Sequence, residues 1–204
     1  MRSDARLRRE AILDAARRLF ADVGLNVAME TIAEAGSVGV GTLYRNFSSR
    51  NELIRAVLLR TFEDIAAAAQ QALAQFPQQP AEAWAALLRR LAGLHLGVLG
   101  QGLGYLDVQS RESLAASRQE ANQLAAQVLA LAAQAGLASR ELTVRDLLLG
   151  IGSVSRPLAN GSLPCFEEQE QRLMQILFAG FEAFENASPD SGPASPEPAG
   201  TSPR

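Results

Sequence analysis

Apolar residues recur every three or four positions along most of this chain, which is the spacing of amphipathic helices. The first stripe lies between residues 4 and 23, and Gly24 follows it where a helix C-cap is expected. Its apolar members are Ile12, Ala16, Leu19, Phe20 and Val23. The pattern therefore predicts a first helix that buries one face.

Two shorter helices are predicted next, over residues 29–35 and 39–47. Gly36-Ser37-Val38-Gly39 interrupts the apolar spacing between them, and Leu43 and Phe47 then resume it four residues apart. This order is helix, tight turn, helix. The second of the two helices is half polar and has only these two large apolar anchors.

A long helix is predicted over residues 50–76. Ser49 and Glu52 have the spacing of a capping box, and the prolines of "FPQQP" (76–80) stop the helix. Four more helices are expected over 81–99, 105–136 with a break, 141–154 and 166–186. No segment has the pattern of a strand, so the predicted fold class is all-α.

The same pattern divides the chain into three parts. Residues 1–49 form a small three-helix domain, and residues 50–186 form a larger helical domain. The segment "SRPLANGSLPC" (155–165) is predicted to be a loop within the second domain. Residues 187–204 hold five of the nine prolines and almost no apolar residue, so this tail is predicted to be disordered.

Charge is distributed unevenly between these parts. Residues 1–60 contain ten Arg and seven acidic residues, whereas the remainder contains nine Arg and fifteen acidic residues. The front of the chain is therefore the part suited to a polyanion. The single Cys165, the lack of an apolar leader after the basic N-terminus, and the lack of a long apolar run predict a cytoplasmic protein.

The polar face of the helix at 39–47 carries side chains that can recognise bases. Thr42, Arg45 and Asn46 share this face, opposite Leu43 and Phe47. Arg can bond guanine bidentately, Asn can bond adenine, and the DNA major groove admits a helix. Helix-turn-helix proteins insert their second helix in this way. The segment by itself equally fits a solvated polar face on a surface helix.

Two longer stretches make the first of these interpretations more specific. "AILDAARRLFADVG" (11–24) and "METIAEAGSVGVGTLYRNFSSRNELIRAV" (29–57) resemble the DNA-binding region of the TetR family, the tetracycline-repressor-like transcriptional regulators. The resemblance implies that Gly41, Thr42, Tyr44 and Arg50 contact DNA phosphates. It also implies that Arg45 and Asn46 lie nearer the bases.

The sequence departs from the family pattern at two positions. Ser37 stands where the turn expects a left-handed residue, usually Gly, and this substitution can store strain of about 1 kcal/mol. Ala28 stands where the family often has a capping Thr, which removes a cap worth about 1 kcal/mol. Asn26 is a candidate substitute cap. Neither departure touches the predicted DNA-binding face.

Two apolar stripes in the second domain are candidates for a dimer interface. They also fit the core of a monomer, whereas the family resemblance implies a four-helix interface between two copies. The candidate interface residues are Leu147, Leu148, Ile151, Val154, Leu173, Ile176, Leu177, Phe181 and Phe184. A homodimer is also what a palindromic operator requires.

A small-molecule inducer of unknown identity is the other partner expected from the resemblance. Glycine is dense between residues 93 and 104, which either leaves room for a ligand or allows a helix to end. The candidate ligand-binding residues are Phe62, His95, Leu99 and Tyr105. His95, the only histidine, fits a buried structural role as well as a ligand contact.

An enzyme is not predicted. One His, one Cys and no glycine-rich phosphate loop after a strand leave no catalytic triad, metal cluster or dinucleotide site to assemble, so no catalytic residue, metal or cofactor is expected. The sequence predicts a ligand-responsive dimeric repressor that binds a palindromic DNA operator. The alternative is a helical protein-interaction adaptor that retains the helix-turn-helix domain as a scaffold.

Overall fold

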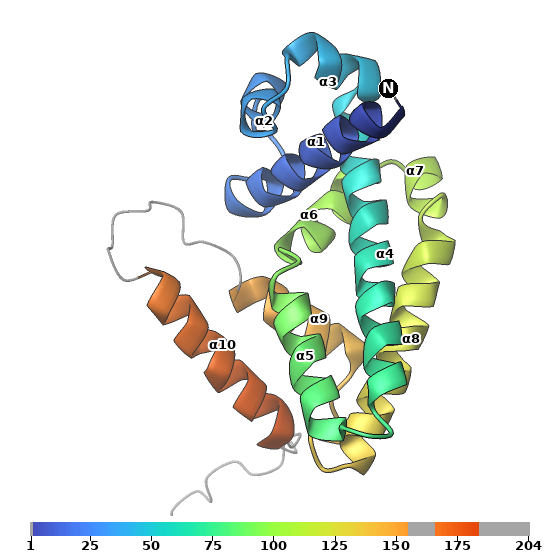
Figure 1. Ribbon diagram of the computed structural model, residues 1–204, viewed down its shortest axis with the longest axis vertical. Coiled ribbons are helices and arrows are strands. Elements are labelled where there is room, and N and C mark those ends of the chain that lie inside the picture. The colour runs from blue at the N-terminus through green and yellow to red at the C-terminus, as the bar shows by residue number, and fades with distance from the viewer. Residues whose placement is uncertain (1, 155–165, 184–204) are drawn as a thin grey trace, which may run out of the picture.

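The computed structural model describes residues 2–154 and 166–183, and every regular element in these ranges is an α-helix. The predicted all-α fold is therefore confirmed. The helices are α1 (Arg2–Asp22), α2 (Met29–Ala35), α3 (Val40–Asn46), α4 (Arg50–Gln75), α5 (Pro80–Ala92), α6 (Gly97–Tyr105), α7 (Val108–Glu112), α8 (Ala115–Gln134), α9 (Val144–Val154) and α10 (Phe166–Ala183). Figure 1 shows α1–α3 together at one end, with α4 leading away from them.

The three front helices pack around a small core of their own. The apolar stripe of α1 supplies Ile12 and Phe20, and Ile32 of α2 and Leu43 of α3 meet it. All four side chains, together with Phe47 just after α3, are fully buried. The spacing of apolar residues therefore identified the faces that hold α3 in place.

The turn between α2 and α3 has the strain that the sequence predicts. Ser37 adopts a φ of 53°, in the left-handed region that favours glycine. A Cβ on the preceding Gly36 would lie 3.3 Å from the carbonyl oxygen of Ile32 and 3.4 Å from that of Ala11, so a larger residue would fit only tightly where α2 ends against α1. No side chain caps the start of α2, as expected from Ala28 at the N-cap position. Asn26 does not replace the missing cap.

Helix α4 begins with the predicted cap, in a modified form. The Ser49 hydroxyl accepts a hydrogen bond from the Glu52 amide, at 3.2 Å. The Glu52 carboxylate bonds the hydroxyl and the amide of Ser48 rather than the amide of Ser49. Bonds from the Ser48 side chain and backbone lower the pKa of Glu52. Hydrogen bonds to Glu52 therefore hold both Ser48 and Ser49, the two residues that connect Phe47 to the start of α4.

In the second domain one predicted helix boundary is wrong, and the break predicted in the following helix is confirmed. The single helix expected over 81–99 ends at Ala92, because Gly93 caps α5 and His95 turns the chain with a φ of 50°. The helix expected over 105–136 is broken by two short connections into the end of α6, then α7 and α8. Asp107 fixes the start of α7 by accepting a hydrogen bond from the Ser110 amide.

Two glycines of α6 allow close helix packing. A Cβ on Gly102 would lie 2.9 Å from Cδ2 of Leu58 on α4, and a Cβ on Gly97 would lie 3.2 Å from the Gly152 carbonyl oxygen on α9. A Cβ on Gly104, in contrast, would meet nothing within 4 Å. Part of the glycine density therefore seats α6 between α4 and α9.

We expect Gly102→Ala to lower the free energy of unfolding by about 1–3 kcal/mol, because the added methyl group overpacks the fully buried Leu58. Gly104→Ala is the matched control. It should be neutral or stabilising by up to about 1 kcal/mol, because alanine favours helix and has room there. Urea unfolding of the two variants measures the difference, and equal effects would contradict this packing role.

Some predictions fall outside the described residues. They are the loop at 155–165 with Cys165, the interface residue Phe184 and the tail at 187–204. Within the described ranges, no helix combines the length and apolar character that crossing a bilayer requires.

Candidate functional site

Helix α3 presents the polar face that the sequence predicts. Leu43 and Phe47 are fully buried beneath it, while Gly41, Tyr44 and Arg45 are exposed. A Cβ on Gly41 would meet nothing within 4 Å, so the backbone is open to an approaching molecule at this point. The structure thus brings five of the six predicted DNA-binding residues together on one short helix, and Arg50 begins the next one.

The two predicted base-contacting side chains lie folded along α3. Arg45 donates from Nε to the Gly41 carbonyl oxygen, at 3.1 Å, and from Nη2 to Oγ1 of Thr42, also at 3.1 Å. Asn46 donates from Nδ2 to the Thr42 carbonyl oxygen, at 2.8 Å. The Arg45 contacts are exposed, the Asn46 contact is partly buried, and all of them stay within about one turn of helix. Reaching a base edge therefore requires only side-chain rotation, not a change of fold.

Arg50 has a structural role that the sequence did not indicate. Its Nη1 donates to the carbonyl oxygens of Leu25 and Val27, both at 2.7 Å. These bonds tie the connection between α1 and α2 to the first turn of α4. The role of Arg50 at a DNA phosphate stays a prediction.

A further cation lies beside α3. The Arg9 guanidinium of α1 is 4.5 Å from the centre of the Phe47 ring, close enough for a cation–π contact, and Arg9 is exposed. Sequence reasoning assigned no role to Arg9, because residues 9 and 47 are related only by the fold. The helix-turn-helix thus has a positive side chain at its edge in addition to Arg45 on α3 itself.

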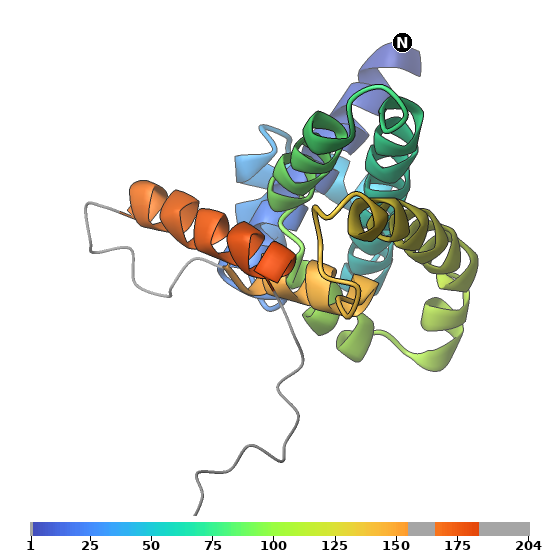
Figure 2. The same ribbon diagram turned by 90° about the horizontal axis from the view of Figure 1, so that it is seen from below.

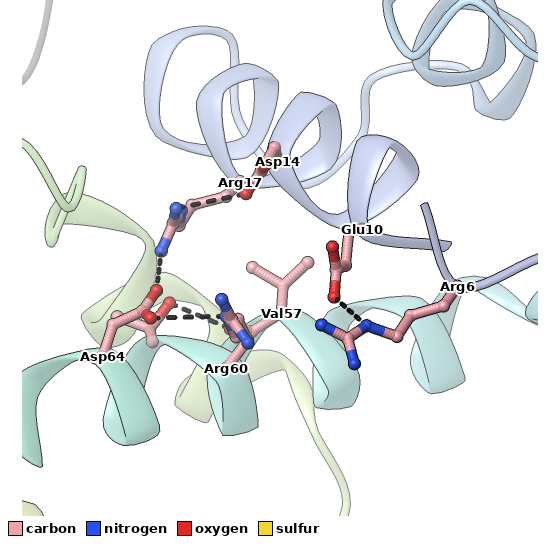
Figure 3. A network of polar contacts seen from close by, with 8 residues as sticks. Arg6, Glu10, Asp14, Arg17, Val57, Arg60 and Asp64 are labelled. Carbon is pink, nitrogen blue, oxygen red and sulfur yellow. Dashed lines mark hydrogen bonds and ion pairs between the residues drawn. The ribbon is translucent and has the colours of Figure 1, made fainter. Parts of the chain in front are cut away.

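An ion-pair network joins the first helix to the long helix α4 (Figure 3). Arg17 of α1 places Nη1 2.6 Å from Oδ2 of Asp64 on α4 and also contacts Asp14, at 3.3 Å. Arg60 contacts the other oxygen of Asp64, at 3.3 Å. The Arg17 and Asp64 side chains are only 14% and 12% exposed, so solvent screens this pair less than a surface pair. The pair fixes α1 to α4 beyond their shared apolar contacts.

Asp64→Asn should lower the free energy of unfolding by about 1–3 kcal/mol, because it leaves the largely buried Arg17 with only its longer contact to the exposed Asp14. The matched control is Glu82→Gln. It breaks the Arg89–Glu82 pair, which is also 2.6 Å long but 61% exposed on both sides, and such pairs contribute about 0–1 kcal/mol. Denaturant titration of both variants tests the comparison; a larger loss from Glu82→Gln would refute it.

The candidate dimer residues divide between the protomer core and its surface. Leu147, Ile151 and Phe181 are at most 5% exposed, and the Phe181 ring packs where a Cβ on Gly150 would lie 3.3 Å away. Leu148, Val154 and Leu177 are partly buried. Leu173 and Ile176 of α10 are 43% and 61% exposed. Helix α10 lies at one side of the molecule in both views (Figures 1 and 2), so its outer apolar face is open to a partner.

The candidate ligand residues are not all in one place. Phe62 and Leu99 line an open groove of about 860 Å³ between α4, α6, α8 and α9. His95 and Tyr105 do not line this groove. His95 lies in the turn between α5 and α6, and Tyr105 ends α6 with 44% of its surface exposed.

Comparisons of sequence agree with the helix-turn-helix interpretation. Residues 12–57 match the family described as bacterial regulatory proteins of the TetR family. Residues 68–183 match the C-terminal domain of SbtR-like transcriptional regulators. A helix-turn-helix-type transcriptional regulator of Staphylococcus aureus strain USA300 is 38% identical over 64 residues, which are 31% of this chain. The match spans only 35% of that relative's length.

Solved structures extend the likeness over both domains. A TetR transcriptional regulator from Streptomyces coelicolor shares 29% identity, with a TM-score of 0.54 over 85% of this chain and 97% of the other. The TetR transcription regulatory protein from Mycobacterium vanbaalenii shares 26% identity, with a TM-score of 0.58 over 88% and 98%. Together with the helix-turn-helix built on α2 and α3, these matches show that the chain is a transcriptional regulator that belongs to the TetR family.

Proposed function

We propose that this chain is a dimeric repressor that binds a palindromic operator through α3 and is released from it by a small-molecule inducer. The observation that carries the proposal is the polar face of α3, seated on the fully buried Leu43 and Phe47. Gly41, Tyr44 and Arg45 are exposed on it, in the part of the chain where Arg outnumbers acidic residues. A helix of this kind suits the major groove and its phosphate rims.

Dimer formation is supported by the outer face of α10. Leu173 and Ile176 are exposed there, and a Cβ on Gly180 would meet nothing within 4 Å, so a second helix can approach closely. A two-fold dimer would present two copies of α3 to half-sites one helical turn apart, about 34–36 Å from centre to centre. An inducer that changes this spacing lowers operator affinity.

Helix α4 is the route proposed for this signal. It begins directly after the helix-turn-helix, contacts α1 through Asp64, and lines the groove with Phe62. An inducer can release DNA only if it binds better to a conformation whose two α3 helices are wrongly spaced. A coupling of about 1–3 kcal/mol is typical, and it is reciprocal, so operator DNA must weaken inducer binding by the same factor.

The adaptor alternative makes a different prediction in a gel-shift assay. A regulator should shift a fragment of the DNA upstream of its own gene in preference to a shuffled fragment of the same length and composition. An adaptor should shift neither fragment at concentrations where the regulator binds. Expression from that upstream region in the presence and absence of the protein then separates a repressor from an activator.

A further inference from the structure

The groove between α4, α6, α8 and α9 has an apolar floor. Phe62 of α4 and Leu99 of α6 line it and are 3% and 9% exposed, with Leu103 and Leu148 beside them. Its volume of about 860 Å³ is within the range of small-molecule sites, which are commonly 300–1,000 Å³. The floor therefore suits the apolar body of a ligand.

Polar side chains also line the groove, among the apolar ones, and the charged residues of the lining are all positive. Arg118 of α8 and Arg145 of α9 line it together with Asn122 and Gln123, and no acidic residue is part of the lining. Asp146, next to Arg145 in sequence, lies outside the lining and bonds the amide and hydroxyl of Thr143 at the start of α9. Both charged residues in the groove lining are therefore arginines.

Neither arginine is tied to a carboxylate by a direct contact within the described part of the chain, although bonds from Thr143 and, less strongly, the nearby charge of Arg145 lower the pKa of Asp146. Neither side chain makes a hydrogen bond there, and no carboxylate oxygen is within 4.0 Å of either, whereas Arg17 and Arg89 are both paired. A guanidinium presents a rigid fork of donors that fits a carboxylate or a sulfonate. A neutral ligand of the same shape would not pair with the charge of these guanidinium groups.

We propose that the groove binds an amphipathic anion, with its apolar body on Phe62 and Leu99 and its acidic headgroup at Arg118 and Arg145. This inference rests on the proposed role as an effector-controlled regulator, for which it names the chemical class of the effector. A carboxylate, a sulfonate and a phosphate monoester share this headgroup chemistry. A cationic amphiphile of the same size is excluded by the charge of the lining.

The position of the groove explains how such a ligand reaches the DNA-binding domain. Phe62 and Asp64 are two residues apart on α4, and side chains with this spacing point about 200° apart around a helix. The ligand therefore acts on one face of α4 while Arg17 of α1 is held on the opposite face. Displacement of α4 by the ligand is transmitted to α1 through this ion pair.

Two fluorescent dyes test the proposal on the full chain. 1-Anilinonaphthalene-8-sulfonate is an amphipathic anion, and N-phenyl-1-naphthylamine is its uncharged analogue. The double variant Arg118→Gln/Arg145→Gln should bind the anionic dye about tenfold more weakly or worse, because charge-assisted hydrogen bonds are lost. Its affinity for the neutral dye should change by less than about twofold, because the apolar floor is intact. Sodium dodecanoate, unlike dodecanol, should displace the anionic dye.

The control is Arg111→Gln/Arg140→Gln, which removes two exposed charges of the same domain from outside the groove lining. It should bind both dyes as the parent protein does. The proposal is overturned if the parent does not bind the anionic dye, if the groove variant loses both dyes equally, or if the control loses as much as the groove variant. Gel shifts of the dye-free variants on upstream DNA distinguish failure of the groove from failure of DNA binding.

Discussion

Ile176→Glu should convert the protein to monomers at micromolar concentration and weaken operator binding by about 100-fold or more. The Ile176 side chain is 61% exposed on α10, so the substitution does not disturb the packing of a single chain. In a two-fold interface each chain would bury one such carboxylate without a partner, at a cost of several kcal/mol. Each monomer then holds only one half-site.

Gln175→Glu is the matched control, because it adds the same charge at an exposed position of α10 that lies about 200° around the helix from Leu173 and about 100° from Ile176. It should remain dimeric. Sedimentation velocity measures assembly, circular dichroism confirms that helix content is retained, and a gel shift measures operator binding. If Ile176→Glu remains dimeric, the outer face of α10 is not the dimer interface. Phe181→Glu tests this less well, since Phe181 is buried within the protomer.

The second large effect is expected at α3. Arg45→Ala should cost about 1–3 kcal/mol on the operator and relax preference at one base position, as loss of a bidentate contact does. The loss on random DNA should be much smaller. Arg45 is exposed and bonds only within α3, so its removal should leave the free energy of unfolding almost unchanged.

Arg50→Ala is the informative comparison. A phosphate contact should weaken operator and random DNA alike and reduce the slope of affinity against salt by about one. The same substitution removes the bonds to the carbonyl oxygens of Leu25 and Val27, so it should also lower the unfolding temperature. Fluorescence anisotropy on both DNAs at several salt concentrations, below that temperature, measures the effects. Equal losses from both variants on both DNAs would refute the division into base and phosphate contacts.

The sequence predicted best what depends on local spacing. The apolar period placed α1, α2, α3 and α4 close to their observed bounds, and the buried Leu43 and Phe47 define the polar face of α3 without further information. The backbone conformation of Ser37 was also predictable, because the turn between α2 and α3 requires a left-handed φ at this position even when the residue is not glycine. These features are decided within a few residues of each other.

Features that join distant segments could not be predicted. Arg17 and Asp64 are 47 positions apart and form a short ion pair only because α1 packs on α4. Arg118 and Arg145 look like solvated positions on two separate helices until the fold places them on one groove. The sequence likewise could not show which apolar residues of α9 and α10 are buried within the chain and which are exposed, because buried and exposed apolar residues follow the same helical spacing.

The measurement closest to the central claim is a footprint of the full chain on the DNA upstream of its own gene. The account predicts two protected half-sites related by two-fold symmetry, with centres about 10–10.5 base pairs or a multiple apart. Arg45→Ala should remove this protection at protein concentrations where the parent saturates it. Protection that is no stronger than on random DNA, or a single asymmetric site filled by one chain, would contradict an operator-binding dimer.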